Sequence, residues 1–258
     1  MSSCDITEEV LISAKKLCKS FLLGTVEQAV LKSLDLDIYT RDFTVIMGAS
    51  GAGKSTLLYA LSGMDKPTKG EIVFKGQRIF GMSNDQLAVF RRKNCGFVFQ
   101  QNLLLDNMSI MDNVLASGLL LNSNKKQLLQ EAEVLLLQIG LGENIWGKFP
   151  TQVSGGEAQR VGIVRALINK PQVVFADEPT GSLNSAAGRA VLDVLSEVNA
   201  QGQSIIMVTH DLNCARRGNR IIYLMDGAVQ GECALGSYDP NDKERQEKLS
   251  QFLIEMGW

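Results

Sequence analysis

The stretch Gly48-Ala-Ser-Gly-Ala-Gly-Lys-Ser-Thr56 decides the fold, because it matches the pattern GxxxxGK[ST] between a predicted strand and a predicted helix. The apolar run Thr44-Val-Ile-Met47 precedes it, and Thr56-Leu-Leu-Tyr-Ala-Leu61 follows it with apolar residues at helical spacing. Glycines allow successive backbone N–H groups to converge on an anion. A helix that begins near Lys54 adds its positive dipole end. The stretch therefore predicts a loop that binds phosphate.

We assign this loop to the phosphates of a nucleotide. Lys54 is predicted to reach the β- and γ-phosphates, and the Ser55 hydroxyl to ligate Mg²⁺. A glycine-rich turn would match the pattern by accident on the order of once per hundred chains of this length, and the flanking strand and helix make an accident rarer. The residues assigned to the nucleotide are Gly48, Ser50, Gly51, Ala52, Gly53, Lys54, Ser55 and Thr56.

A pair of acids follows a second predicted strand. The apolar run Val173-Val-Phe-Ala176 is typical of a buried parallel strand, and it ends in Asp177-Glu178. Ligands gather at the carboxyl ends of such strands. We therefore predict that Asp177 holds Mg²⁺ through water and that Glu178 orients and deprotonates the attacking water. Two solvated acids at a strand end are the plain alternative, and the phosphate loop favours the catalytic role.

The segment Val153-Ser-Gly-Gly-Glu157 lies shortly before the acidic strand. Ser154 with Glu157 forms an S-x-x-E capping box, which predicts the start of a helix that ends near Asn169, ahead of Pro171. A glycine-flanked helix N-terminus is a second anion site, although on their own these residues are explained better by a well-capped helix without a ligand. The apolar face of the predicted helix comprises Val161, Val164, Ala166 and Leu167.

This segment resembles the signature of ABC proteins, usually LSGGQ or LSGGE, with Val in the first position, and the resemblance covers about residues 12–232. It implies that Ser154, Gly155, Gly156 and Glu157 grip the γ-phosphate of ATP held by a second subunit, so that a two-fold homodimer encloses two ATP molecules. It also implies an α/β P-loop NTPase fold with a mixed central sheet and an antiparallel β subdomain. A single ABC ATPase domain would span 1–258, with a helical subdomain inserted at about 101–165 and a helical tail at 237–258.

Three further residues fall where the resemblance predicts function. Gln100, after Gly96-Phe-Val-Phe, resembles the glutamine that senses Mg²⁺ and the γ-phosphate, with a surface amide as the alternative. His210 is the only histidine, and it resembles the switch histidine whose neutral ring hydrogen-bonds the γ-phosphate; a structural histidine is the alternative. Phe21 aligns with the aromatic residue that stacks on adenine, and a core residue is the alternative.

One position departs from the resemblance. The loop Thr180-Gly-Ser-Leu-Asn184 normally ends in Asp, so that Asn184 keeps the size and the hydrogen bonding but loses the charge. Communication between the two ATP sites is therefore in question. Because Glu178 is intact, we expect a working ATPase, and the sequence leaves open whether Asn184 slows it.

The remaining segments predict helices and contact surfaces. Residues 126–139 show helical periodicity and are followed by Gly140, which suits a helix end. Segment 103–111 is apolar for a loop and contains Met108 and Met111, which core packing would explain. The resemblance implies instead a groove for a membrane partner, a contact that adaptable Met suits. The tail predicts a short helix that docks either on its own domain or on a partner, through Leu249, Phe252, Leu253 and Met256.

The amino-acid composition limits the kinds of partner that we expect for this chain. The balance of 26 basic and 28 acidic residues gives no reason to expect nucleic acid. The five cysteines form no CxxC pair, which favours reduced thiols over a zinc site or disulfides. The N-terminal ten residues lack the basic and apolar runs of a signal peptide, and no run approaches the ~18 apolar residues of a spanning helix. With the resemblance, this implies a cytoplasmic protein held at the inner face of the cell membrane by a transmembrane permease.

The motifs GFVFQQ, SGGE and ADEPTGSL most resemble the macrolide-export and lipoprotein-release branch, which includes bacterial antimicrobial-peptide transport ATPases. This resemblance implies Mg²⁺-dependent ATP hydrolysis that powers a separate permease for export or removal of a peptide, lipid-linked or amphipathic substrate. The alternative is a soluble ABC-type ATPase that acts on nucleic acid or ribosomes. Such proteins would show paired cassettes, a coiled-coil insertion or zinc-spaced cysteines. A nucleotide kinase or GTPase is disfavoured by the SGGE helix, by His210 and by the lack of an [NT]KxD motif.

Overall fold

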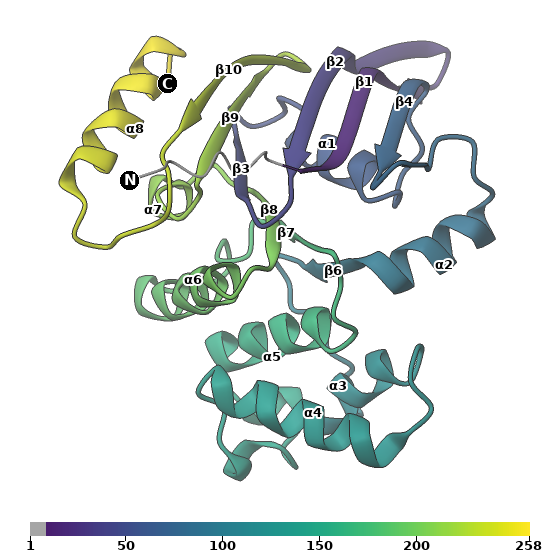
Figure 1. Ribbon diagram of the computed structural model, residues 1–258, viewed down its shortest axis with the longest axis vertical. Coiled ribbons are helices and arrows are strands. Elements are labelled where there is room, and N and C mark those ends of the chain that lie inside the picture. Colours follow the sequence, from purple (N-terminus) through teal and green to yellow (C-terminus); the bar gives the residue numbers. More distant parts are fainter. Residues whose placement is uncertain (1–8) are drawn as a thin grey trace, which may run out of the picture.

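A six-stranded sheet forms the centre of the structure, a computed structural model that describes residues 9–258 (Figure 1). The strand order is β10-β9-β3-β8-β7-β6. Neighbours from β9 to β6 run parallel, and β10 is antiparallel to β9, so that the sheet is mixed as predicted. Cys4 and most of the N-terminal stretch considered for a signal peptide lie outside the described residues. The bounds are β3 Phe43–Met47, β6 Cys95–Val98, β7 Val173–Asp177, β8 Ser204–Val208, β9 Arg220–Met225 and β10 Ala228–Ala234.

The central strands β3, β7 and β8 are mostly apolar because both faces of the sheet are covered. Along β7, Val173 and Phe175 belong to the core on one face, and Val174 and Ala176 belong to the core on the other. The same alternation holds along β8, as expected for side chains that point to opposite faces in turn. Unbroken apolar runs that end in polar residues are thus explained by burial on both sides.

A second, antiparallel sheet, with the order β2-β1-β4-β5, covers one face, and the prediction of such a subdomain is confirmed. Helix α1 (Lys54–Leu61) lies between the two sheets. Its residues Leu57, Leu58 and Leu61 are completely buried in a core shared with Phe175 of β7. Helix α2 connects this layer to β6. The bounds are β1 Val10–Leu23, β2 Val26–Tyr39, β4 Lys69–Phe74, β5 Gln77–Arg78 and α2 Asn84–Asn94.

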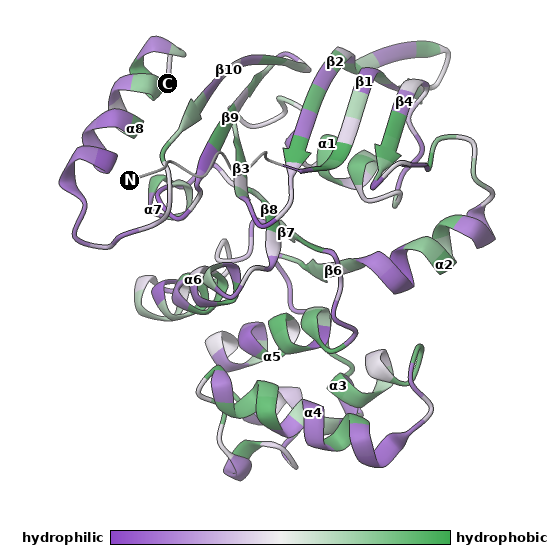
Figure 2. Cartoon of the chain, in the orientation of Figure 1, coloured by the Kyte–Doolittle hydropathy of each residue, from purple (hydrophilic) through white to green (hydrophobic). Residues whose placement is uncertain are grey.

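Helices α3, α4 and α5 form a region at the lower end of the molecule in Figure 1. Their apolar sides face one another in Figure 2. Helix α4 confirms the helix predicted at 126–139, with a shift of one residue. Helix α5 begins at the predicted capping box and ends two residues before Asn169, because Lys170 takes a left-handed backbone (φ 50°) that turns the chain into β7. Helix α5 also contacts β6 and α6. The bounds are α3 Ile110–Gly118, α4 Lys125–Gln138, α5 Gly155–Leu167 and α6 Ser185–Ala200, with one-turn helices at Glu143–Ile145 and Pro150–Gln152.

The C-terminal helix α8 (Lys243–Glu255) docks on its own domain, which settles the choice that the sequence left open. Its residues Leu249 and Leu253 are buried in the same core as Tyr223 of β9. Beyond the helix, the Trp258 ring meets the Tyr223 ring edge-on, with 6.4 Å between centroids. The short helix α7 (Leu212–Ala215) precedes β9.

Two simple properties of the described chain bear on the predictions. The four described cysteines, Cys18, Cys95, Cys214 and Cys233, are free thiols, as expected. Within residues 9–258, no helix combines the length and the apolarity that a membrane crossing needs.

Candidate functional site

Four parallel strands end at one edge of the central sheet, and each end carries residues that the sequence singled out. Strand β3 leads into the phosphate loop and β6 leads to Gln100; β7 ends in Asp177 and Glu178, and β8 leads to His210. The register places Asp177 opposite Val208, and Val208 is also paired with Ile46 just before the loop. The topology therefore gathers the predicted residues at the edge where open α/β sheets bind ligands.

The loop depends on glycine at its first position. Gly48 has φ 149°, and a Cβ there would lie 2.1 Å from the backbone oxygen of Leu224. Gly51 and Gly53 also have positive φ, at 80° and 99°. Positive φ is costly for residues with a side chain. The fold thus requires the glycines that the phosphate pattern contains.

Lys54 is buried within this loop, with 8% of its surface exposed. Its Nζ donates to the carbonyl oxygens of Gly48 (2.8 Å) and Ala49 (2.9 Å). Burial lowers the pKa of Lys54, and the carboxylates of Glu178 and Asp177 oppose that shift. The loop therefore carries a cation that its own backbone holds in place.

The Asp177 carboxylate accepts a hydrogen bond at each oxygen. Ser55 Oγ donates to Oδ1 (2.9 Å), and the Tyr59 hydroxyl donates to Oδ2 (2.6 Å). Burial and the adjacent Asp177 raise the pKa of Tyr59 to about 12, so that its hydroxyl stays protonated at neutral pH. A hydroxyl beside a carboxylate is the hard oxygen donor set that suits Mg²⁺. Ser55 and Asp177 were predicted from their motifs, whereas Tyr59 belongs to no motif in the sequence.

Glu178 follows directly, in a left-handed conformation (φ 47°), with its N–H bonded to the carbonyl of Val208 (3.0 Å). One carboxylate oxygen lies 2.7 Å from Nδ1 of His210, and the other accepts from Thr209 Oγ1 (3.4 Å). The His210 side chain is 67% exposed, against 19% for Glu178. The His210 ring is thus exposed and paired to a carboxylate, and its contact with the γ-phosphate stays a prediction.

Gln100 lies against the segment that follows β7. Ser182 Oγ donates to the carbonyl of Gln100 (2.9 Å), and a Cβ on Gly181 would lie 2.9 Å from Nε2 of Gln100. The Gln100 amide therefore packs on a glycine of the 180–184 loop. The structure thus brings these two predicted segments into direct contact.

Gln159, which sequence analysis did not single out, joins the same segments from α5. It is 2% exposed, and its Nε2 donates to the carbonyls of Phe99 (2.7 Å) and Pro179 (2.8 Å). One amide thus connects the exits of β6 and β7 to the helix that starts at Ser154. The only sequence signal was a polar residue among the apolar neighbours of a predicted helix.

Replacing Gln159 with Leu is expected to lower the free energy of unfolding by about 2 kcal/mol, because two buried carbonyls lose their donor. Urea unfolding followed by circular dichroism measures this effect. The matched control is Gln130→Leu on the exposed side of α4, which should leave stability nearly unchanged. Equal stability of the two variants would show that the Gln159 bonds contribute nothing.

The start of α5 forms the predicted capping box. Ser154 Oγ accepts from the Glu157 N–H (3.3 Å), and the Ser154 N–H donates to Glu157 Oε2 (2.7 Å). The side-chain and backbone bonds from Ser154 lower the pKa of Glu157. Ser154 and Gly155 are exposed, whereas Gly156 is buried on α6, where a Cβ would lie 2.8 Å from that of Ala187. The helix therefore presents its first residues at the surface.

Asn184 has a structural role that explains its residue type. Its side chain caps α6 by accepting from the Ala187 N–H (2.9 Å). Asn and Asp are equally good at this position. The loss of charge therefore leaves the cap intact, and the effect on communication between ATP sites stays a prediction.

We expect Asn184→Ala to lower the free energy of unfolding by about 1 kcal/mol, because the cap is lost, and Asn184→Asp to keep it. Thermal unfolding of the three proteins tests both expectations. A stable alanine variant would mean that the hydrogen bond to Ala187 is not a stabilising cap. ATP turnover by Asn184→Asp separately tests whether a charge at this position raises the rate.

Phe21 is 42% exposed on β1, so the alternative of a core residue is wrong. Lys19 Nζ lies 4.7 Å from its ring centroid. That ammonium is itself bound by Asp65 Oδ1 (2.6 Å) and the Lys66 carbonyl (2.8 Å). The ring is thus exposed above a fixed cation, and its stacking on adenine stays a prediction.

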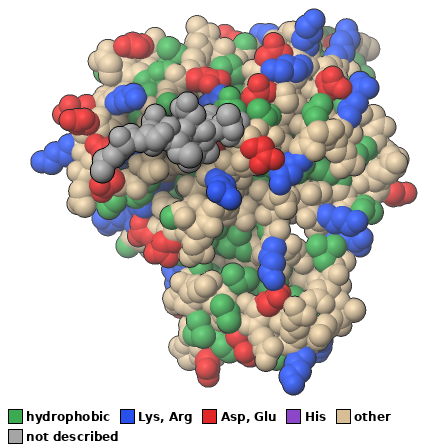
Figure 3. Space-filling view, viewed as in Figure 1, with side chains coloured by type: hydrophobic (Ala, Val, Ile, Leu, Met, Phe, Trp, Pro, Cys, Tyr) green, Lys and Arg blue, Asp and Glu red, His purple; other side chains and the backbone are tan. Residues whose placement is uncertain are grey.

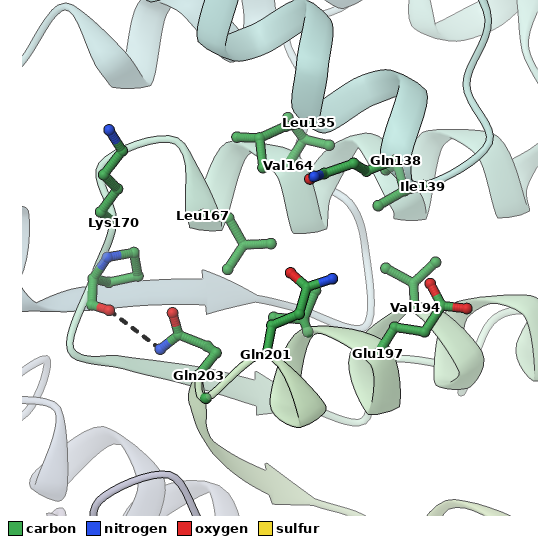
Figure 4. A pocket seen from close by; sticks show the side chains of 13 residues that line it. Leu135, Gln138, Ile139, Val164, Leu167, Lys170, Val194, Glu197, Gln201 and Gln203 are labelled. Carbon is green, nitrogen blue, oxygen red and sulfur yellow. Dashed lines mark hydrogen bonds between the residues drawn. The ribbon is translucent and has the colours of Figure 1, made fainter.

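A cavity of about 300 Å³ lies elsewhere, between α4, α5 and α6 (Figure 4). Its lining includes Gln138, Leu167, Glu197 and Gln203, and it includes none of the predicted site residues. This cavity is therefore not part of the predicted site.

Basic and acidic side chains are interspersed on the face of the molecule shown in Figure 3.

Comparison with known proteins identifies the family. The model of the ABC transporter family matches residues 31–181. An uncharacterized ABC transporter ATP-binding protein of Methanocaldococcus jannaschii is 43% identical over 219 residues, 85% of this chain and 97% of its own. The lipoprotein-releasing system ATP-binding protein LolD of Idiomarina loihiensis is 40% identical over 87% of this chain and 98% of its own. The macrolide export ATP-binding/permease protein MacB of Wolinella succinogenes is 41% identical over 86% of this chain, which spans only 34% of that relative.

Two solved structures agree with the fold. The dimeric structure of a bacterial ABC transporter cassette matches with TM-score 0.80 and 37% identity, over 88% of this chain and all of that one. A dimeric post-hydrolysis state bound to ADP and Pi matches with TM-score 0.78 and 35% identity, over the same shares of the two chains. The chain therefore belongs to the ABC transporter family. Within that family it is an ATP-binding cassette and an ATP hydrolase.

Proposed function

We propose that the chain is the ATPase subunit of a transporter for export or lipoprotein release, and that it powers a separate membrane permease. Relatives named for macrolide export and lipoprotein release, each matching more than four fifths of this chain, support this proposal. The substrate would be a peptide, a lipid-linked molecule or an amphipathic compound. The chain would work at the cytoplasmic face of the membrane.

One observation carries the catalytic part of the proposal: the loop, the Ser55–Asp177 pair and the Glu178–His210 pair lie at neighbouring strand ends. Lys54 and the loop amides would bind the phosphates of ATP. Ser55 and Asp177, with Gln100, would hold Mg²⁺, which supplies charge neutralisation between phosphate oxygens. Glu178 would accept the proton of the attacking water, and His210 would orient Glu178 and contact the γ-phosphate.

We further propose a two-fold dimer in which Ser154, Gly155, Gly156 and Glu157 contact ATP held by the loop of the second subunit. Two features support it: the exposed start of α5 is a capped helix N-terminus suited to an anion, and two similar cassettes are dimeric. Phe21 would stack on the adenine of the nucleotide.

The surface for the permease is proposed at segment 103–111. Leu103 and Leu105 are 54% and 50% exposed, although the segment is rigidly tied down. Both Arg165 amino groups donate to backbone carbonyls at 102 and 103, and buried Asn113 bonds the N–H and carbonyl of Leu105. A fixed backbone that exposes leucines favours a partner surface over the core packing that the sequence left open.

Purification of the tagged chain from detergent-solubilised membranes of its native cells tests this proposal. We expect a multi-spanning membrane protein in stoichiometric amount, and ATP turnover that changes when it is present. Leu105→Asp should abolish recovery of that protein. Val134→Asp, at a 55% exposed position on α4, is the matched control and should not. Recovery of ribosomes or DNA in place of a membrane protein would establish the alternative of a soluble ATPase.

A further inference from the structure

Helix α1 holds the Asp177 carboxylate with two side chains from one face. Ser55 and Tyr59 are four residues apart, so that they lie one turn from each other on α1. Ser55 Oγ donates to Oδ1 and the Tyr59 hydroxyl donates to Oδ2, at 2.9 Å and 2.6 Å. Because each oxygen of Asp177 has its own donor, the carboxylate cannot turn without breaking one of the two bonds.

Tyr59 is itself well fixed. Its ring is half-buried and packs on the apolar core between the two sheets. Its carbonyl accepts from Ser62 Oγ (3.1 Å), from the Met64 N–H (2.9 Å) and from the Asp65 N–H (3.1 Å), which anchors the end of α1. The hydroxyl is therefore delivered to Asp177 from a rigid element, as residues that orient metal ligands generally are.

The hydroxyls of Ser55 and Tyr59 differ in their distance from the phosphate loop along α1. A serine hydroxyl that donates its proton to Asp177 keeps two lone pairs, with which it can still ligate a cation. Tyr59 reaches the other carboxylate oxygen from the second turn of the helix, one turn beyond the phosphate loop. Ser55 thus lies beside the phosphate loop with lone pairs available for a cation, whereas the contact of Tyr59 with the site is its bond to Asp177.

We propose that Tyr59 is a positioning residue for the metal that accompanies ATP, because it locks the orientation of the Asp177 carboxylate beside Ser55. This inference rests on the proposed role of Asp177 in holding Mg²⁺. It assigns to the second turn of α1 a function that neither the phosphate-loop pattern nor the signature segment contains.

Tyr59→Phe tests the inference, since it removes one hydroxyl and keeps the ring in the core. The dissociation constant of a fluorescent ATP analogue is measured with Mg²⁺ and with EDTA. We expect no change in EDTA and about a tenfold loss of the tightening that Mg²⁺ gives, as is usual when the partner of a metal ligand is lost. The Mg²⁺ concentration for half-maximal ATP turnover should rise by a similar factor, with kcat at saturating Mg²⁺ little changed.

Two further variants separate the possible outcomes. Tyr39→Phe removes a hydroxyl from β2, away from the site, and should match the parent protein. Asp177→Asn should lose the Mg²⁺ response whatever Tyr59 does, and if it keeps that response the proposed metal site itself is wrong. If Asp177→Asn loses the response and Tyr59→Phe keeps it, Tyr59 does not position Asp177. Equal weakening of nucleotide binding by Tyr59→Phe with Mg²⁺ and with EDTA would likewise overturn the inference, because it indicates a purely structural role.

Discussion

Glu178→Gln is expected to lower kcat for ATP hydrolysis by about 10²–10⁴-fold while ATP still binds. An amide has the volume of the carboxylate and can still accept from Thr209 or from a protonated Nδ1 of His210, so that the packing survives. It cannot accept a proton from water at neutral pH. The substitution therefore removes the proposed base and leaves the phosphate loop untouched.

Phosphate release at saturating Mg²⁺ and ATP measures the loss, and light scattering with ATP or ADP measures assembly. The variant should accumulate an ATP-dependent dimer, because it binds ATP but cannot hydrolyse it. Glu197→Gln on α6, beside the 300 Å³ cavity and outside the proposed site, is the matched control and should turn over normally. A Glu178→Gln protein that keeps its turnover and stays monomeric with ATP would show that the proposed mechanism is wrong.

Gly48→Ala is expected to have the second largest effect, a loss of about 3 kcal/mol of stability or a comparable loss of ATP affinity, about 100-fold. The added Cβ would lie 2.1 Å from the Leu224 oxygen, and Leu224 is completely buried in β9, so the strand cannot yield. Either the folded protein keeps the clash and loses stability, or the loop moves away from its phosphate-binding conformation and ATP affinity falls. Thermal unfolding and nucleotide titration distinguish the two responses.

The chain provides a matched control in Gly51. This residue also has positive φ, but nothing lies within 4 Å of the position its Cβ would take. Gly51→Ala should therefore lower the free energy of unfolding by only about 1 kcal/mol, the cost of holding alanine at a positive φ. If the two alanine variants unfold at the same temperature and bind ATP equally well, the close approach to Leu224 is not the reason that Gly48 is required.

Local signals were enough to predict most of the fold. Periodicity and capping within a few residues indicate the loop, the strand that ends at Asp177, the strand that leads to His210 and the helix that begins after Ser154. The structure confirms these elements. Family resemblance supplied the antiparallel sheet and the inserted position of the helical subdomain, whereas periodicity indicated the helix at 126–139 itself. Helix α8 was also predicted, but not what it packs against, because docking depends on which surfaces of the sheet remain uncovered.

The contacts that organise the site could not be predicted, because they join side chains far apart in the sequence. Tyr59 and Asp177 are separated by 118 residues, and Gln159 lies 60 residues from Phe99. Asn184 shows a different limit. The sequence indicated a lost charge, whereas the structure shows a helix cap that Asn provides as well as Asp does. The residue type alone did not distinguish a role for charge at position 184 from a role for the capping hydrogen bond.

The shared amide of Gln159 has a mechanical consequence. Its single nitrogen is bonded at once to the chain just before Gln100 and to the chain just after Glu178. A displacement of α5 must carry both segments together or break one bond. While both bonds hold, a displacement of α5 therefore moves the chain beside the proposed γ-phosphate sensor and the chain beside the proposed base together.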